Sequence, residues 1–212
     1  MDLTACNQII VFGGSFDPPH RAHVVLPEQV RLAIGADAVA YVPAARAPHK
    51  LDRVQTAAEH RLAMLRLALA DRPCAVVLTD ELDRAADGQP SYTVDTLEAL
   101  RRRLPAHVTL RLLMGADQVR IFDQWRASQR VAELAEPVVM VRPPETKTSL
   151  LASLDDEAER TRWARRLVKV DRMEISSSMV RERVRQGEPV DDLVPPAVAR
   201  YIAEHGLYRE AE

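Results

Sequence analysis

Short apolar runs alternate along the chain with longer stretches in which apolar residues recur at helical spacing. Each run is short enough to be a buried strand. This alternation predicts a doubly wound, Rossmann-like α/β fold, with a parallel sheet of about five strands and helices on both faces. The first and fourth strands should lie side by side at the switch point. The expected strands are Ile9–Phe12, Ala38–Val42, Cys74–Leu78, Val108–Met114 and Pro137–Val141.

The helical stretches carry their own start and stop signals. Ala22–Ile34 ends at Gly35, which readily adopts the left-handed conformation of a helix end. Pro27 leaves the carbonyl of His23 without its usual donor, so the helix should kink there or begin its regular part there. Further helices are expected after a capping box at Thr56–Glu59, from Ser91 to about Leu104, and from the serines at 176–178 to Gly187. Asp80–Pro90 should be a loop, and Glu145–Arg166 a solvated loop and helix.

Composition narrows the class of protein. The 212 residues should form one domain, 1–212, whose C-terminal helical segment covers about 176–212. A formal net charge of −2 argues against a large nucleic-acid surface. Cys6 and Cys74 lie far apart and fit a reducing cytoplasm. We expect neither a signal peptide nor a membrane span, because no apolar run approaches the ~18–20 residues that a span needs.

The stretch after the first strand combines several features of a phosphate site. Gly13 and Gly14 allow a sharp turn and a close approach to a ligand, and a helix begins soon after Ser15 and Phe16. The N-terminus of that helix favours an anion. His20 and His23, three residues apart, could each donate an N–H to an anionic oxygen. Taken alone, the two glycines could form only a turn, and the two histidines could be only surface residues. The whole string favours phosphate binding.

Two later segments also suit a nucleotide. Gly115 and Asp117 follow the fourth strand, where a carboxylate could accept bonds from ribose hydroxyls or cap the next helix. Ser176 and Ser177 open a helix that carries Arg181, and serines at a helix start can cap it and bind an anion. Arg185, one turn further, could be a solvent-facing residue only.

The string Gly-Gly-Ser-Phe-Asp-Pro-x-His-x-x-His resembles the first motif of the nucleotidylyltransferase superfamily, with Ala22 where that motif has glycine. Ile-Ser-Ser-Ser-x-Val-Arg, ending at Arg181, resembles its second motif, with Ser178 in place of threonine. The resemblance implies that the two motifs grip the ATP phosphates from opposite sides. His20, His23 and Arg181 would be the catalytic residues.

Three other strings resemble nicotinate mononucleotide adenylyltransferases. They are Pro-His49-Lys50 with Ala47 before it, Ser-Tyr92-Thr93-x-Asp-Thr-Leu, and Gly-Ala-Asp followed by Phe-x-x-Trp125. The resemblance implies that these residues bind the pyridine mononucleotide, with Phe122 and Trp125 on one helix. It further implies ATP binding by Gly13, Gly14, Ser15, Phe16, Gly115, Asp117, Ser176 and Ser177.

The implied reaction is adenylyl transfer from ATP to nicotinate mononucleotide in NAD biosynthesis. The sequence offers no Asp/Glu/His cluster for a metal cage, so Mg²⁺ should arrive with ATP. Alternatives are transfer to nicotinamide mononucleotide or phosphopantetheine, transfer from CTP, an aminoacyl-tRNA synthetase, a catalytically silent nucleotide-binding module, and a purely structural α/β protein. The sequence leaves the choice between nicotinate and nicotinamide open, as it does the oligomeric state.

Overall fold

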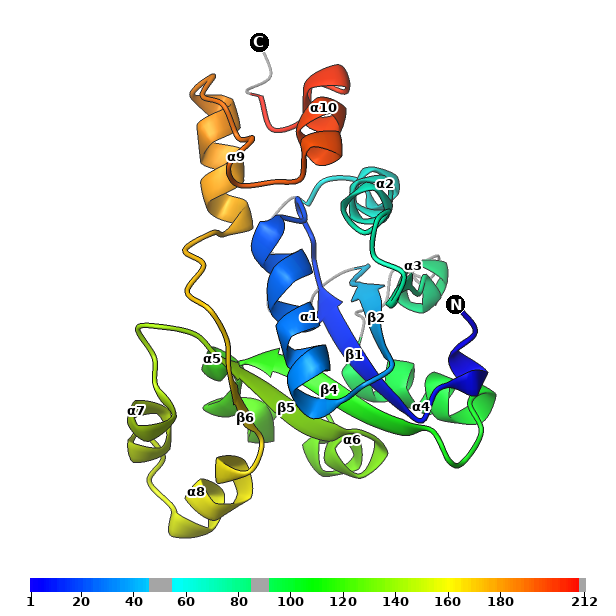
Figure 1. The fold of residues 1–212 in the computed structure, drawn as a ribbon, viewed down its shortest axis with the longest axis vertical. Coiled ribbons are helices and arrows are strands. Elements are labelled where there is room, and N and C mark those ends of the chain that lie inside the picture. Colours follow the sequence, from blue (N-terminus) through cyan, green and yellow to red (C-terminus); the bar gives the residue numbers. More distant parts are fainter. Residues whose placement is uncertain (46–54, 85–91, 210–212) are drawn as a thin grey trace.

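The structure, a computed structural model, describes residues 1–45, 55–84 and 92–209. It contains a parallel six-stranded sheet with the order β3-β2-β1-β4-β5-β6 (Figure 1). The adjacency of β1 and β4 at the centre is confirmed, and it makes their carboxyl ends the switch point. The strands are β1 Gln8–Gly14, β2 Ala38–Pro43, β3 Ala75–Val77, β4 Thr109–Gly115, β5 Glu136–Val141 and β6 Leu167–Lys169.

The helices connect the strands and follow the sheet. They are α1 Arg21–Ile34, α2 Ala58–Ala68, α3 Asp80–Arg84, α4 Thr93–Arg103, α5 Ala116–Val119, α6 Ser128–Leu134, α7 Lys147–Ala152, α8 Glu157–Ala164, α9 Ser177–Arg185 and α10 Pro196–Glu204. Two 3₁₀ helices, η1 Leu3–Ala5 and η4 Phe122–Gln124, complete the described elements. Within these ranges, no helix is both long and apolar enough to cross a membrane.

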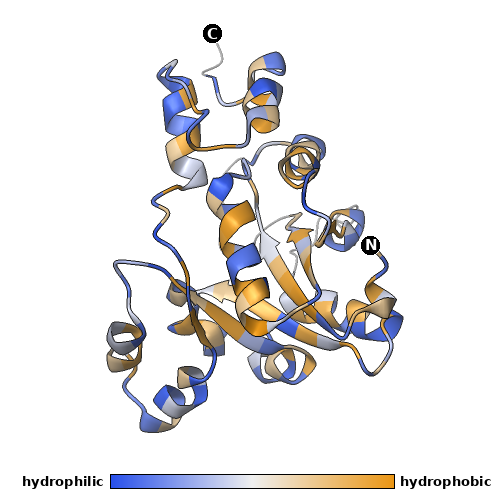
Figure 2. Ribbon diagram, viewed as in Figure 1, coloured by the Kyte–Doolittle hydropathy of each residue, from blue (hydrophilic) through white to orange (hydrophobic). Residues whose placement is uncertain are grey.

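Alternate residues of the strands divide the core into two layers. Ile9 and Val11 face a cluster built with α4 to α8, whereas Ile10 and Phe12 face a cluster built with α1, α2, α9 and α10. This period of two is what a sheet covered on both faces requires. Figure 2 shows hydrophobic residues concentrated on the strands and along α1. The segment after β6 therefore shares a core layer with the first helix.

The first helix is continuous through Pro27, so its regular part does not begin there. It runs from Arg21 to Ile34 and ends at Gly35, which has a φ of 67°. The carbonyl of His23, which Pro27 cannot satisfy, instead accepts a hydrogen bond of 3.1 Å from the hydroxyl of Tyr41 on β2. A side chain from the sheet thus replaces the missing backbone donor.

Four sequence-based expectations were wrong. A sixth strand, β6, follows the expected five, and Asp80–Arg84 forms α3 where a loop was expected. The capping box at Thr56 does not form, because α2 begins after Ala57 and has no side-chain cap. Phe122 and Trp125 do not share a helix: α5 ends at Val119, and a separate 3₁₀ turn carries Phe122. The stretch 145–166 contains two helices, α7 and α8.

Candidate active site

The loop after β1 turns tightly around one buried aromatic ring. Phe16 has a φ of 48° and an exposed fraction of only 1 %. Its ring lies 5.1 Å from the His23 ring, and a Cβ at Gly14 would come within 2.9 Å of it. A left-handed non-glycine residue is strained, so the surrounding packing must hold it in place. Glycine at position 14 is therefore required by the close approach of this ring.

The two histidines of the first motif stack at the start of α1. Their ring centroids are 3.7 Å apart with planes 20° from parallel. The backbone N–H of His20 donates to Nδ1 of His23 over 3.3 Å. Because Nδ1 accepts this bond, a neutral His23 carries its proton on Nε2. The methyl group of Ala22, which replaces the motif glycine, is buried in the core layer beside α1.

His20 is electrostatically unusual. It is 4 % exposed, and its Nδ1 has no hydrogen-bond partner in the part of the chain that the structure describes. Burial, followed by the positive charge of Arg142, lowers the pKa of His20 to about 4. At neutral pH the ring is uncharged, so it can donate one N–H to an anion without carrying a charge. Arg142, which follows β5, was given no role in the prediction from sequence.

We expect His20 to destabilise the protein as pH falls. Between pH 6.5 and about 4 the unfolded chain binds a proton at His20 and the folded chain does not, so the free energy of unfolding declines as pH falls. The full shift corresponds to about 3 kcal/mol at pH 4. Urea unfolding of the wild type and His20→Asn at pH 7 and pH 4 checks this. The wild type should lose more stability than the variant, and equal losses would refute the assignment.

Residues of the second motif contact the loop that follows β1 in the first motif. Ser176 caps α9 by accepting the N–H of Met179 over 3.1 Å, as the sequence predicts. The hydroxyl of Ser177 donates to the carbonyl of Pro18, and Arg181 Nη1 donates to the carbonyl of Asp17 over 2.7 Å. Arg185 pairs with Glu182 at the surface. Ser177 and Arg181 thus contact the loop that precedes the two histidines. Figure 1 shows the start of α9 next to the start of α1.

The end of β4 lies beside the end of β1. Val11 pairs with Leu112, so Gly14 and Gly115 stand at equivalent positions three residues further on. Gly115 is the N-cap of α5, and Asp117 is an exposed residue in its first turn that accepts a bond of 2.6 Å from Gln118. A Cβ at Gly115 would collide with a carboxylate oxygen of Asp117. The glycine therefore allows the Asp117 carboxylate to sit at this strand end.

The candidates for the pyridine mononucleotide lie on the α4 side of the sheet. Tyr92 precedes Thr93, the first residue of α4, and the guanidinium of Arg126 lies 4.4 Å from the Tyr92 ring centroid. Trp125, next to Arg126, packs 5.5 Å from the Phe122 ring. Its indole Nε1 is buried and has no partner within the described ranges. His49, Lys50 and Ser91 lie outside the described residues.

Two residues that support the candidate site were not predicted from the sequence. Arg61 on α2 is 1 % exposed and donates to backbone carbonyls of separate segments, including those of Ser15 and Ala44. Tyr208, after α10, donates its hydroxyl to the carboxylate of Asp17 over 2.7 Å. Arg61 does carry a sequence signal, because it stands at helical spacing with the apolar core residues Met64, Leu65 and Ala68. Tyr208 carries none.

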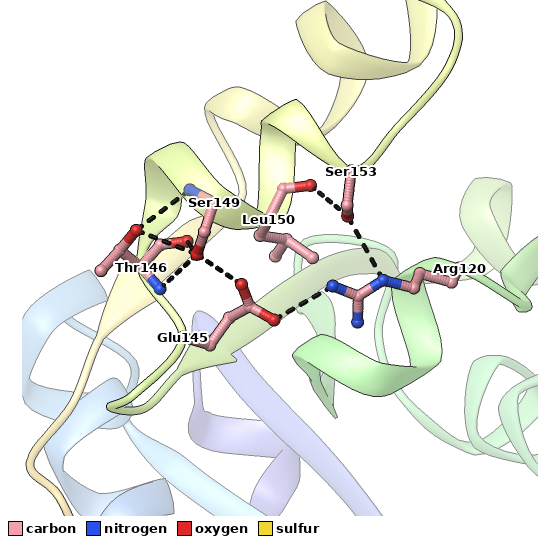
Figure 3. Close-up of polar contacts among 6 residues, drawn as sticks. All are labelled: Arg120, Glu145, Thr146, Ser149, Leu150 and Ser153. Carbon is pink, nitrogen blue, oxygen red and sulfur yellow. Dashed lines mark hydrogen bonds and ion pairs between the residues drawn. The ribbon is translucent and has the colours of Figure 1, made fainter.

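The segment for which the sequence suggested no role is anchored beside α5. Arg120, which ends α5, donates to Glu145 over 3.1 Å and to the hydroxyl of Ser153 over 3.2 Å (Figure 3). Glu145 also accepts the hydroxyl of Ser149, and Ser149 forms a capping box with Thr146 at the start of α7. These contacts fix α7 against the helix that follows β4.

The described residues provide no cage for a resident metal ion: no three of their His, Cys, Asp or Glu side chains form a group that could hold one. The chemistry present is instead that of an anion site. It consists of a neutral His20, the adjacent His23, a serine-capped helix start and arginines at the carboxyl ends of β1 and β5. The fold and this site define a class of α/β proteins that handle nucleotide phosphates at the switch point.

Comparison with known proteins agrees and is more specific. Residues 11–183 match the cytidylyltransferase-like family. A probable nicotinate-nucleotide adenylyltransferase of Dehalococcoides mccartyi strain CBDB1 is 36 % identical over 198 residues, which cover 93 % of this chain and 95 % of the relative. The nicotinate-nucleotide adenylyltransferase of Bacillus subtilis strain 168 is 32 % identical over 205 residues, covering 95 % and 98 %. The chain belongs to the nicotinate-nucleotide adenylyltransferases, which are nucleotidyltransferases of NAD biosynthesis.

Solved structures agree on the fold. The nicotinic acid mononucleotide adenylyltransferase of Plasmodium falciparum, complexed with NaAD, superposes with a TM-score of 0.72 at 17 % identity. The match covers 95 % of this chain and 97 % of that one. At this identity the likeness extends to the fold alone, and it confirms the Rossmann-like α/β architecture that the alternation of strands and helices predicts.

Proposed function

We propose that the chain catalyses adenylyl transfer from ATP to nicotinate mononucleotide by direct in-line attack. A phosphate oxygen of the mononucleotide forms a bond to the α-phosphorus of ATP, the bond from that phosphorus to the bridging oxygen breaks, and pyrophosphate leaves. No covalent enzyme intermediate is needed, so positioning and charge stabilisation supply the rate. The observation that carries the proposal is the convergence of Ser177 and Arg181 on the loop that leads to His20 and His23.

Each motif has a role in this reaction. His20 and His23 would donate to phosphate oxygens in the transition state. The uncharged ring of His20, and the hydrogen bond that leaves Nε2 of His23 as its donor, support that role. Arg181 would hold the β- and γ-phosphates, a contact that suits the planar guanidinium. The other proposed ATP contacts are Gly13, Gly14, Ser15, Phe16, Gly115, Asp117, Ser176 and Ser177. The proposed mononucleotide contacts are His49, Lys50, Tyr92, Thr93 and Trp125.

Mg²⁺ would enter as part of the substrate, MgATP. The ion is small and keeps several waters, so phosphates and water can provide most of its ligands. Its charge would offset that of the triphosphate.

The whole chain would act as one nucleotidylyltransferase domain, which the core layer shared by α1 and α9 supports. A cytoplasmic location is supported by the two cysteines, Cys6 and Cys74, which are both free.

The deciding experiment measures pyrophosphate release with MgATP and either nicotinate or nicotinamide mononucleotide at equal concentration. A strong preference for the nicotinate form is the expected result. Equal rates would keep the reaction but refute the specificity. If neither substrate gives pyrophosphate, the assignment fails, and phosphopantetheine is the next substrate to test.

A further inference from the structure

The loop that precedes the two histidines is held almost entirely by distant parts of the chain. Phe16 adopts a left-handed backbone with a φ of 48°, a strained conformation for a residue with a bulky side chain. On either side of it, the carbonyl of Ser15 accepts from Arg61, and the carbonyls of Asp17 and Pro18 accept from α9. A strained loop keeps one geometry only while such contacts persist.

The Asp17 side chain, unlike the Asp17 carbonyl, is held by residues outside α9. It is 8 % exposed, and its two carboxylate oxygens have separate partners. Oδ1 accepts the hydroxyl of Tyr208 over 2.7 Å, and Oδ2 accepts the backbone N–H of Thr56 over 3.3 Å. The bond from the Tyr208 hydroxyl is the shorter of the two.

Tyr208 itself adopts an unfavourable backbone conformation to make this contact. Its φ is 65°, which is uncommon for a residue with a bulky side chain. Burial and the neighbouring Asp17 charge both raise the pKa of the Tyr208 hydroxyl, so it stays protonated and can donate. Backbone strain of this kind marks positions that the surroundings over-determine.

We propose that Tyr208 is a positioning residue for adenylyl transfer: its hydroxyl fixes Asp17, and Asp17 fixes the approach of the chain to His20. The inference rests on the proposed function and extends it to a residue that is not among the proposed substrate contacts. Asp17 lies three residues before His20, so rotation of its carboxylate would loosen the loop at the point where it enters α1.

A second tyrosine of the same segment provides a matched control. Tyr201 on α10 bonds through its hydroxyl to Nδ1 of His60 on α2, over 3.0 Å. This contact also ties the C-terminal segment to the body of the protein, but it does not touch the loop of residues 15–18. If the tyrosine hydroxyls serve only to dock this segment, removing either one should have the same effect on the enzyme.

The test compares wild type, Tyr208→Phe and Tyr201→Phe in pyrophosphate release with MgATP and nicotinate mononucleotide, together with thermal unfolding. We expect Tyr208→Phe to lower kcat about tenfold. The KM for the mononucleotide should stay within about twofold, because its proposed contacts lie on other elements. Tyr201→Phe should keep kcat within about twofold of wild type, even if its Tm falls as much as that of Tyr208→Phe.

The outcomes separate the inference from the function on which it rests. Wild-type kcat in Tyr208→Phe, or equal losses of kcat in both variants, would overturn the positioning role while leaving the reaction established. A loss confined to KM for the mononucleotide would also overturn it. A wild-type enzyme that releases no pyrophosphate would refute the proposed function, and the role of Tyr208 in adenylyl transfer with it.

Discussion

Alanine in place of either His20 or His23 is expected to lower kcat for adenylyl transfer by more than about tenfold, a loss of ~1.4 kcal/mol of transition-state stabilisation. Both rings lie at the N-terminus of α1, stacked 3.7 Å apart. Removing one fixed donor from a water-poor site that stabilises a developing charge commonly costs this much or more. Since the charge develops during the reaction, kcat should fall more than KM rises.

Two further variants sharpen this experiment. His20→Asn keeps an N–H donor and should recover part of the activity that His20→Ala loses. His107→Ala is the control, because His107 is exposed on the turn before β4, at the opposite end of the strands from the site. Wild-type turnover in both His20→Ala and His23→Ala would contradict their assignment as catalytic residues. An equal loss in His107→Ala would show that the assay reports general damage.

The features predicted well from sequence are those coded by local patterns. The buried apolar strands covered by helices on both faces and the Gly35 stop depend on neighbouring residues, and both are confirmed. The adjacency of β1 and β4 follows from the general layout of doubly wound sheets. The strand β6 was not predicted because Leu167–Lys169 is only three residues long and lies among charged residues at the sheet edge. Such a run has too little apolar periodicity to be recognised.

Where local signals failed, tertiary contacts overrode them. Thr56 has the sequence of a capping residue, yet its backbone N–H donates to Asp17 and its carbonyl accepts from Arg61. These bonds place Thr56 outside α2. Likewise, α5 is only one turn long, and the chain then buries Phe122 beside Trp163. A helix extended from sequence periodicity cannot anticipate such a turn.

The residues of the candidate site divide in the same way, into those found in local sequence motifs and those brought in by tertiary contacts. The histidines, Ser177 and Arg181 stand in short contiguous motifs, so the resemblance of these motifs to the superfamily was enough to bring them together in a prediction. The contact between Tyr208 and Asp17 joins residues 191 positions apart. A hydroxyl and a carboxylate separated by that distance have no pattern in common, so only the fold reveals their contact.

Methionine in place of Arg61 is expected to destabilise the protein by about 3 kcal/mol, because it leaves buried carbonyl acceptors unsatisfied. The guanidinium donates to the carbonyls of Thr56, Ser15 and Ala44 over 2.7–2.9 Å, and to that of Ala45 over 3.2 Å. Burial lowers the pKa of Arg61, which reflects the cost of placing a cation there. An apolar replacement recovers that cost. It cannot donate, however, and the four acceptors are backbone carbonyls that stay behind without this donor.

Urea unfolding can measure the balance between the desolvation cost that methionine recovers and the hydrogen bonds that it loses. Arg61→Lys keeps the charge but presents a point donor in place of a planar fork, so it should unfold between wild type and Arg61→Met. Arg66→Met is the matched control, because Arg66 is exposed on the same helix; its stability should stay within about 0.5 kcal/mol of wild type. If Arg61→Met is as stable as Arg66→Met, the recovered desolvation outweighs the lost bonds. The backbone at Ser15, Ala44 and Thr56 would then keep its geometry without the buried cation.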